Sequence, residues 1–171
     1  MSDFLNKNYF EVFDIPVEYT LDLSSLRDRF REVQRVVHPD KFSSESSQVQ
    51  RLAAQNAAHA NQAFQTLKDP ITRGFCVLTL LGYRCADESE TINDSVFLMR
   101  QIDFRERLEV GGEEALLALL SEVELELGSL QQQVAVCLKA HAVEGQLNQA
   151  ESLLKKMQFY NRLVEEIESK I

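Results

Sequence analysis

The segment His38-Pro39-Asp40-Lys41 separates two long helical patterns and decides how the first half of the chain folds. Before it, apolar residues recur every three or four positions from Leu23 to Val37, which is the spacing of one helix face. A second pattern of this kind runs from about Gln48 to Lys68. A residue that precedes proline is pushed out of helical geometry, so the first helix ends at His38. The sequence therefore predicts two antiparallel helices joined by a polar loop.

Two shorter helices flank this predicted hairpin. One covers Asn8–Phe13, with its aromatic residues facing inward, and it stops before Pro16. The other runs from Pro70, which is tolerated in a first helical turn, to Leu81, and Gly82 follows it as a typical C-terminal cap. We expect residues 1–83 to form one helical domain.

The second half of the chain predicts three further helices. Residues 84–93 are polar and acidic and form the predicted connector. The helices cover about 94–110, 113–143 and 146–171, and glycines at 111, 112 and 145 separate them. Short turns between long amphipathic helices favour an antiparallel three-helix bundle over residues 94–171. The predicted fold class is all-α, with two domains.

The charge distribution supports this division and excludes one class of partner. Residues 1–86 carry 10 Lys and Arg against 10 Asp and Glu, whereas residues 87–171 carry 8 against 17, which is the whole net charge of −9. An acidic C-terminal half repels phosphate backbones, so we expect no nucleic-acid partner.

A basic stripe precedes the His-Pro-Asp segment. Arg27, Arg31 and Arg35 are spaced four residues apart, so they lie on one polar helix face that leads to the loop. Charges in such a row can steer an acidic partner. Three other interpretations compete: a solvated face followed by a turn, a catalytic His–Asp pair, and a nucleic-acid-binding stripe, which would carry more Lys and Arg and some stacking aromatic residues. The catalytic interpretation is weak, because no nucleophile or metal cluster accompanies the pair.

The cysteines and the termini limit other functions. Cys76, Cys85 and Cys137 are an odd number at wide spacings without a Cys-x-x-Cys pair, which argues against a disulfide framework and a zinc site. A thiol enzyme remains an alternative, and replacing all three cysteines with serine would then abolish its activity. Neither a secretion signal nor a stretch of roughly 20 apolar residues is present. We expect a cytoplasmic protein with no membrane partner, no metal and no cofactor.

The predicted bundle has more apolar surface than its core needs. With about 100° per residue, Phe97, Phe104 and Leu108 share one face, while Leu98, Met99 and Ile102 point away from it. On the last helix Leu153, Leu154, Met157, Tyr160, Val164 and Ile167 form the expected core stripe, and Phe159 lies off it. The excess widens the core, packs on the first helical domain, or forms an exposed patch with acidic edges, as a partner site does.

The order of these N-terminal features resembles a J domain: a short helix, a basic helix, His-Pro-Asp and an alanine-rich antiparallel helix. This resemblance implies a loop that docks on a DnaK-type chaperone and stimulates its ATPase. His38, Pro39 and Asp40 would be the trigger, and Lys41 with Arg27, Arg31 and Arg35 would supply the docking charges. The protein would then be a co-chaperone and not an enzyme.

Nearly the whole chain is similar to the HscB family of iron–sulfur co-chaperones. The similarity rests on Tyr9-Phe10-Glu11-Val12-Phe13, on residues 38–42, on Asn61–Leu67 and on Phe97–Gln101. It implies two partners: an HscA-like ATPase and an IscU-type iron–sulfur scaffold. It also implies that the scaffold binds Leu98, Met99, Ile102, Asp103, Glu106 and Phe159. Val110 stands where the family often has a further acid, and Asp103 replaces a longer Glu.

One alternative keeps the J domain and changes the role of the bundle. The bundle could hold unfolded clients in general, or it could be a dimerisation element. Unrelated unfolded clients would then bind as well as a cluster scaffold does.

Overall fold

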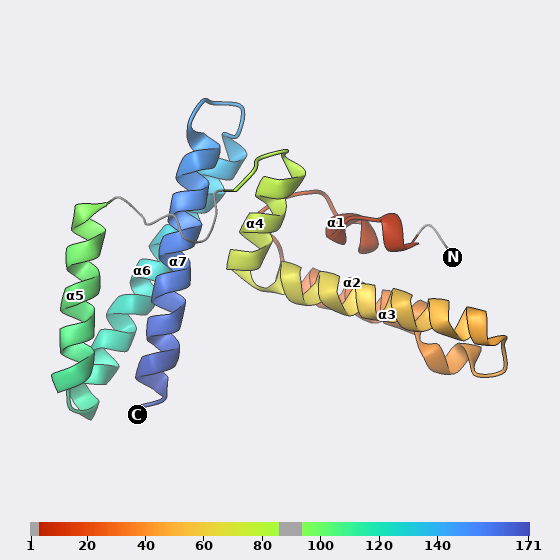
Figure 1. Ribbon diagram of the computed structural model, residues 1–171, viewed down its shortest axis with the longest axis horizontal. Coiled ribbons are helices and arrows are strands. Elements are labelled where there is room, and N and C mark those ends of the chain that lie inside the picture. The colour runs from red at the N-terminus through yellow and green to blue at the C-terminus, as the bar shows by residue number, and fades with distance from the viewer. Residues whose placement is uncertain (1–3, 86–93) are drawn as a thin grey trace. The chain divides into compact units, whose positions relative to one another are not determined.

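A computed structural model describes residues 4–85 and 94–171, and every regular element in these two ranges is a helix (Figure 1). The chain forms two compact units, Met1–Val77 and Leu78–Ile171. Most of the predicted connector lies outside the described residues. The domain boundary at residues 83 and 84 therefore stays a prediction, and each unit is described by itself.

The N-terminal unit contains the predicted helical hairpin. The longer helices are α2 (Leu23–Val37), α3 (Ser47–Lys68) and the beginning of α4 (Pro70–Leu80). The short elements are η1 (Phe4–Asn6), α1 (Tyr9–Val12) and η2 (Pro39–Phe42). Asp22 caps α2, because its carboxylate accepts hydrogen bonds from the backbone amides of Ser24 and Ser25.

Aromatic rings and small side chains hold the hairpin together. Phe30 of α2 stacks on Phe64 of α3 with ring centroids 4.2 Å apart. Ala53, Ala60 and Ala63 are fully buried, and their small side chains let a neighbouring helix approach closely. Leu23 is the first residue of α2 and of its apolar stripe and remains 37% exposed, whereas Leu26 one turn later is buried.

A buried arginine fixes the start of α4. The Nε of Arg73 donates to the carbonyl of Tyr19 at 2.7 Å, and its Nη1 donates to the carbonyl of Leu67 at 2.6 Å. The guanidinium also lies over the Tyr19 ring, 5.1 Å from its centroid. One side chain therefore joins the loop after α1, the end of α3 and α4.

The C-terminal unit contains a bundle of three helices: α5 (Ser95–Val110), α6 (Glu113–Lys139) and α7 (Gln146–Glu168). Figure 1 shows α6 and α7 side by side, with α5 beside α6. Phe104 is fully buried at the centre, edge-on to Tyr160 of α7. The predicted α5 core of Phe97, Phe104 and Leu108 is confirmed.

Two predictions about the bundle need correction. Helix α6 ends at Lys139 rather than at Val143, because a turn with Gly145 at φ 82° connects it to α7. On α7 the buried residue is Leu163, at 2% exposure, and Val164 is only half-buried. Both residues fit a helical stripe that contains Tyr160 and Ile167, so only packing could choose between them.

None of the helices in the described ranges is both long and apolar enough to cross a membrane.

Candidate functional site

The His-Pro-Asp segment forms a compact exposed turn at the end of α2. His38 terminates the helix with φ −59° and ψ 127°, and Pro39 begins the single 3-10 turn η2. The backbone amide of Asp40 donates to Nδ1 of His38 at 3.3 Å, which holds the ring against the turn. The side chain of Asp40 is 90% exposed and that of His38 is 50% exposed. Both polar groups can therefore reach a partner without any rearrangement of the turn.

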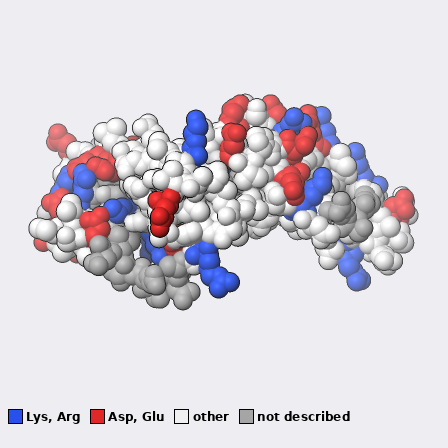
Figure 2. Space-filling model, turned by 90° about the horizontal axis from the view of Figure 1, so that it is seen from above, with Lys and Arg blue, Asp and Glu red and all other residues white. Residues whose placement is uncertain are grey.

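The basic residues beside this turn are all exposed. Arg27, Arg35 and Lys41 form no ion pair within the described part of the chain, whereas Arg31 contacts Asp28 of its own helix at 3.2 Å. They follow one another along α2 and into η2, so together they present a row of positive charge to an acidic surface. In the view of Figure 2, basic and acidic side chains are interspersed among broad uncharged areas.

The second candidate site is an apolar face of α5. Met99 is 73% exposed, Ile102 is 60% exposed and Leu98 is 38% exposed, although Phe97 beside them is buried. Phe159 of α7 is half-buried and stands edge-on to Phe97 at 5.6 Å. These exposed apolar residues of α5 therefore lie outside the core of the bundle, whereas Phe159 packs partly into it against Phe97 and Tyr160.

Acidic residues line one edge of this face. Asp103 and Glu106 are exposed, and Glu106 forms no ion pair with a described residue. Asp103 is bound to Arg107, whose Nη1 lies 3.4 Å from its carboxylate. The face thus has one free carboxylate and one that is already held by its own helix.

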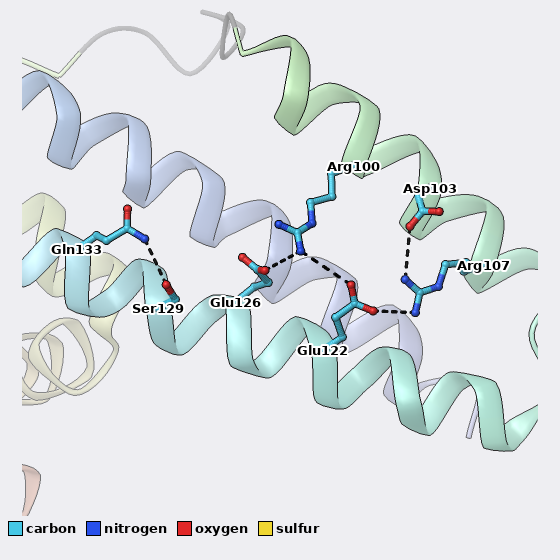
Figure 3. A network of polar contacts seen from close by, with 7 residues as sticks. All are labelled: Arg100, Asp103, Arg107, Glu122, Glu126, Ser129 and Gln133. Carbon is cyan, nitrogen blue, oxygen red and sulfur yellow. Dashed lines mark hydrogen bonds and ion pairs between the residues drawn. The ribbon is translucent and has the colours of Figure 1, made fainter.

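An ion-pair network fixes α5 on α6, and sequence reasoning missed it (Figure 3). Arg107 donates to Glu122 at 2.8 Å, and this bond raises the pKa of the guanidinium. Arg100 contacts Glu126 at 2.7 Å and Glu122 at 3.9 Å. Both arginines also lie 5.7 Å from the centroid of the Phe104 ring. Charge spacing along each helix could have suggested these residues, but only the bundle shows that they meet.

One end of α5 is tied to α7, and the other is tied to Lys170, which follows α7. The Asp94 carboxylate caps the helix by accepting a hydrogen bond from the backbone amide of Phe97. Lys156 also donates to this carboxylate at 2.6 Å, and this hydrogen bond lowers the pKa of Asp94. At the other end Lys170 donates to the carbonyl of Leu108 at 3.0 Å. These contacts fix the position of α5 in the bundle, so the apolar face lies on a helix that is held at both ends.

The thiols show no feature of an activated nucleophile. Burial raises the pKa of Cys76, Cys85 and Cys137, so each thiolate is disfavoured. Within residues 4–85 and 94–171, no cluster of three or more His, Cys, Asp or Glu is arranged to bind a metal ion.

The chain is similar in sequence to known proteins. A family model described as the HSCB C-terminal oligomerisation domain matches residues 93–168. A co-chaperone protein HscB homolog of Shewanella amazonensis is 39% identical over 165 residues, which cover 94% of this chain and 95% of the relative. A second homolog, from Shewanella pealeana, is 51% identical over 102 residues, which cover 60% of this chain and 59% of the relative.

Solved structures show the same architecture. HscB of Vibrio cholerae superposes with a TM-score of 0.84 at 34% identity, over 96% of this chain and 97% of that protein. Human HscB superposes with a TM-score of 0.89 at 25% identity, over 96% of this chain and 82% of that one. The predicted all-α fold, a J domain followed by a helical C-terminal domain, is confirmed. On this evidence the chain belongs to the HscB family, whose members are co-chaperones and not enzymes.

Proposed function

We propose that this co-chaperone stimulates the ATPase of an HscA-like, DnaK-type chaperone and presents an IscU-type scaffold to it during iron–sulfur cluster assembly. The observation that carries the proposal is the exposed apolar face on α5, with Asp103 and Glu106 at its edge, in a chain of the HscB family. Unpartnered apolar side chains at the centre and charges at the rim are the anatomy of a protein-binding site.

The His-Pro-Asp turn supports the first half of the proposal. Asp40 offers a carboxylate for a charge-assisted hydrogen bond; its side chain is 90% exposed, and its Oδ2 lies 3.6 Å from Nδ1 of His38. Pro39 restricts the turn, so little conformational entropy is lost when a partner binds. Arg27, Arg35 and Lys41 provide charges that steer an acidic chaperone surface toward the turn.

The coupling between the two partners follows from mass action. A protein that holds the scaffold and the chaperone together raises the effective concentration of each for the other. The iron–sulfur cluster is the cargo of the scaffold, and this chain needs no cluster ligands of its own. The three free thiols are compatible with a reducing cytoplasm as the site of action.

The test is the steady-state ATPase rate of the cognate chaperone, with this protein alone, with the scaffold alone and with both. Strong synergy supports the proposal. His38→Gln should abolish the stimulation and leave scaffold binding unchanged, whereas His141→Gln, at an exposed histidine of the bundle, should change neither.

The scaffold site is tested by a second pair of variants. Leu98→Ala combined with Phe159→Ala should weaken scaffold binding by about 10- to 100-fold, since truncation of an interface anchor typically costs at least 1 kcal/mol. Val143→Ala removes an exposed apolar side chain elsewhere in the bundle and should have no such effect. Equal binding of unrelated unfolded clients would instead favour a general client-holding role for the bundle.

A further inference from the structure

The loop that joins η2 to α3 lies at the tip of the hairpin formed by α2 and α3 (Figure 1). Residues 43–46 of this loop are all exposed, and none of them is a proline that would restrict the backbone. An exposed polar segment of this kind has no buried side chain to fix its conformation. Hydrogen bonds therefore have to hold this part of the backbone in place.

The side-chain amide of Gln50 supplies two such hydrogen bonds. Its Nε2 donates to the carbonyl of Ser43 at 3.0 Å and to the carbonyl of Glu45 at 3.0 Å. A primary amide carries two hydrogens, so one side chain can make both bonds at once. The backbone of Gln50 belongs to α3, because its own amide donates to the carbonyl of Ser46. Gln50 therefore ties two points of the loop to a regular helix.

These hydrogen bonds continue into the His-Pro-Asp turn. Ser43 is the residue at which η2 ends, and its backbone amide donates to the carbonyl of Asp40 at 3.4 Å. The backbone amide of Glu45 donates to the carbonyl of Phe42 at 3.0 Å. Ser43 is thus held on two sides, by Asp40 through its amide and by Gln50 through its carbonyl. A short chain of hydrogen bonds connects Asp40 to α3.

The Gln50 side chain does not act as a cap of α3. The first turn of a helix has free backbone amides, and these need acceptors. Ser46 supplies an acceptor, because its Oγ lies 3.4 Å from the amide nitrogen of Val49. Gln50 instead donates, and both of its acceptors precede the helix. Its side-chain hydrogen bonds therefore stabilise the loop rather than the end of the helix.

We propose that Gln50 is a positioning residue for the stimulation of the chaperone ATPase, an inference that rests on the proposed function. Gln50 keeps the loop, and with it the His-Pro-Asp turn, in the docking conformation before the chaperone binds. The apparent affinity for a partner falls with the population of the conformation that the partner binds. Loss of the two bonds should raise the half-maximal concentration for stimulation by roughly five- to tenfold. The maximal rate should not change, because the docked turn is the same.

The experiment is a titration of the cognate HscA-like ATPase with the full-length protein and its variants. Gln50→Met keeps an unbranched side chain of similar length and removes both donors. Gln48→Met is the matched control, because Gln48 is exposed on the same helical turn and its side chain donates to no described residue. Gln50→Met should raise the half-maximal concentration, and Gln48→Met should not. Both variants should reach the maximal rate of the unmodified protein.

A lysine at the same position tests whether the hydrogen bonds are responsible. The ammonium group of Gln50→Lys can again donate to both carbonyls. Gln48→Lys adds the same charge to the first turn of α3, so it measures the effect of the charge on docking and on the helix dipole. The half-maximal concentration for Gln50→Lys should therefore match that for Gln48→Lys and lie below that for Gln50→Met.

NMR of the free protein separates positioning from direct contact with the chaperone. The order parameters of the backbone amides of residues 40–46 report how far this segment moves on the picosecond to nanosecond timescale. These order parameters should fall in Gln50→Met and should be unchanged in Gln48→Met. Helicity measured by circular dichroism should be the same in both variants.

The role of Gln50 would be overturned if Gln50→Met had the half-maximal concentration of the unmodified protein. A raised half-maximal concentration with unchanged order parameters would also overturn it, because Gln50 would then be a contact residue. A Gln50→Lys variant as weak as Gln50→Met would exclude the two hydrogen bonds as the cause. If the unmodified protein gave no stimulation, the proposed function itself would fail, and the role of Gln50 would fail with it.

Discussion

The buried guanidinium of Arg73 should make a large contribution to the stability of the N-terminal unit. Its two short hydrogen bonds, 2.7 Å to the Tyr19 carbonyl and 2.6 Å to the Leu67 carbonyl, come from a charged donor in a residue that is 4% exposed. Arg73→Met keeps an unbranched side chain of comparable length and removes every donor. The two carbonyls then lose their charged partner.

The expected cost follows from these bonds. A hydrogen bond to a charged group contributes about 1.5–3 kcal/mol net, so two of them contribute roughly 3–6 kcal/mol. Burial lowers the pKa of Arg73, which shows that desolvation of the charge offsets part of this gain. We therefore expect a loss of about 3 kcal/mol. For a unit of 77 residues this lowers the melting temperature by about 12–24 °C.

The assay is thermal and urea unfolding followed by circular dichroism. Arg51→Met is the matched control, because Arg51 is exposed on α3. The stability of Arg73→Lys should lie between those of Arg73→Met and Arg51→Met. An ammonium group keeps the charge, but it lacks the planar set of donors with which a guanidinium reaches both carbonyls. Well below the melting temperature, ATPase stimulation by Arg73→Met should remain intact.

An Arg73→Met variant as stable as Arg51→Met would refute the reasoning. Buried charges can be replaced by apolar side chains without loss when desolvation cancels the electrostatic gain. That outcome would mean that the Tyr19 and Leu67 carbonyls find other partners, and that packing alone holds α4.

Three further predictions concern single side chains. Tyr19→Phe should be neutral or stabilising by about 1–2 kcal/mol in urea unfolding at pH 8, because the buried hydroxyl has no hydrogen-bond partner among the described residues. Burial raises the pKa of Tyr19 from 10.0 to about 12. Between these pH values the hydroxyl ionises in the unfolded chain but not in the folded one, so the free energy of unfolding of the unmodified protein should fall as the pH rises. Tyr19→Phe should not show this fall. Asp94→Asn should lower the free energy of unfolding at neutral pH. This difference from the unmodified protein should shrink as the pH falls below 3.8, because the hydrogen bond from Lys156 holds the pKa of Asp94 in the folded chain below that value. Phe104→Ala should lower the free energy of unfolding by about 3–5 kcal/mol, because Phe104 is fully buried. Phe159→Ala, at a half-buried residue, should lower it by less than half as much, and denaturation curves recorded in parallel measure both.

Local signals in the sequence were sufficient to predict where the helices begin and where the turn lies. Asp22 and Pro39 act on their immediate neighbours, through a cap and a steric clash, and such effects do not need the rest of the fold. The same holds for the α5 core, because helical periodicity alone separates Phe104 from Met99. The sequence therefore predicted which α5 residues are candidates for an exposed face. The roles of the predicted site residues stay predictions until partners are measured.

Tertiary structure decided the features that depend on two helices at once. Leu163 rather than Val164 is buried because both satisfy the helical period and only contact with neighbouring helices distinguishes them. The ion pairs of Arg107 with Glu122 and of Lys156 with Asp94 join residues on different helices, and no period along one helix encodes such a meeting. The sequence by itself determined where the helices begin and which faces they offer, since these depend on short-range geometry. Packing determined which faces are covered and how α5 is braced, because those contacts exist only after the chain has folded back on itself.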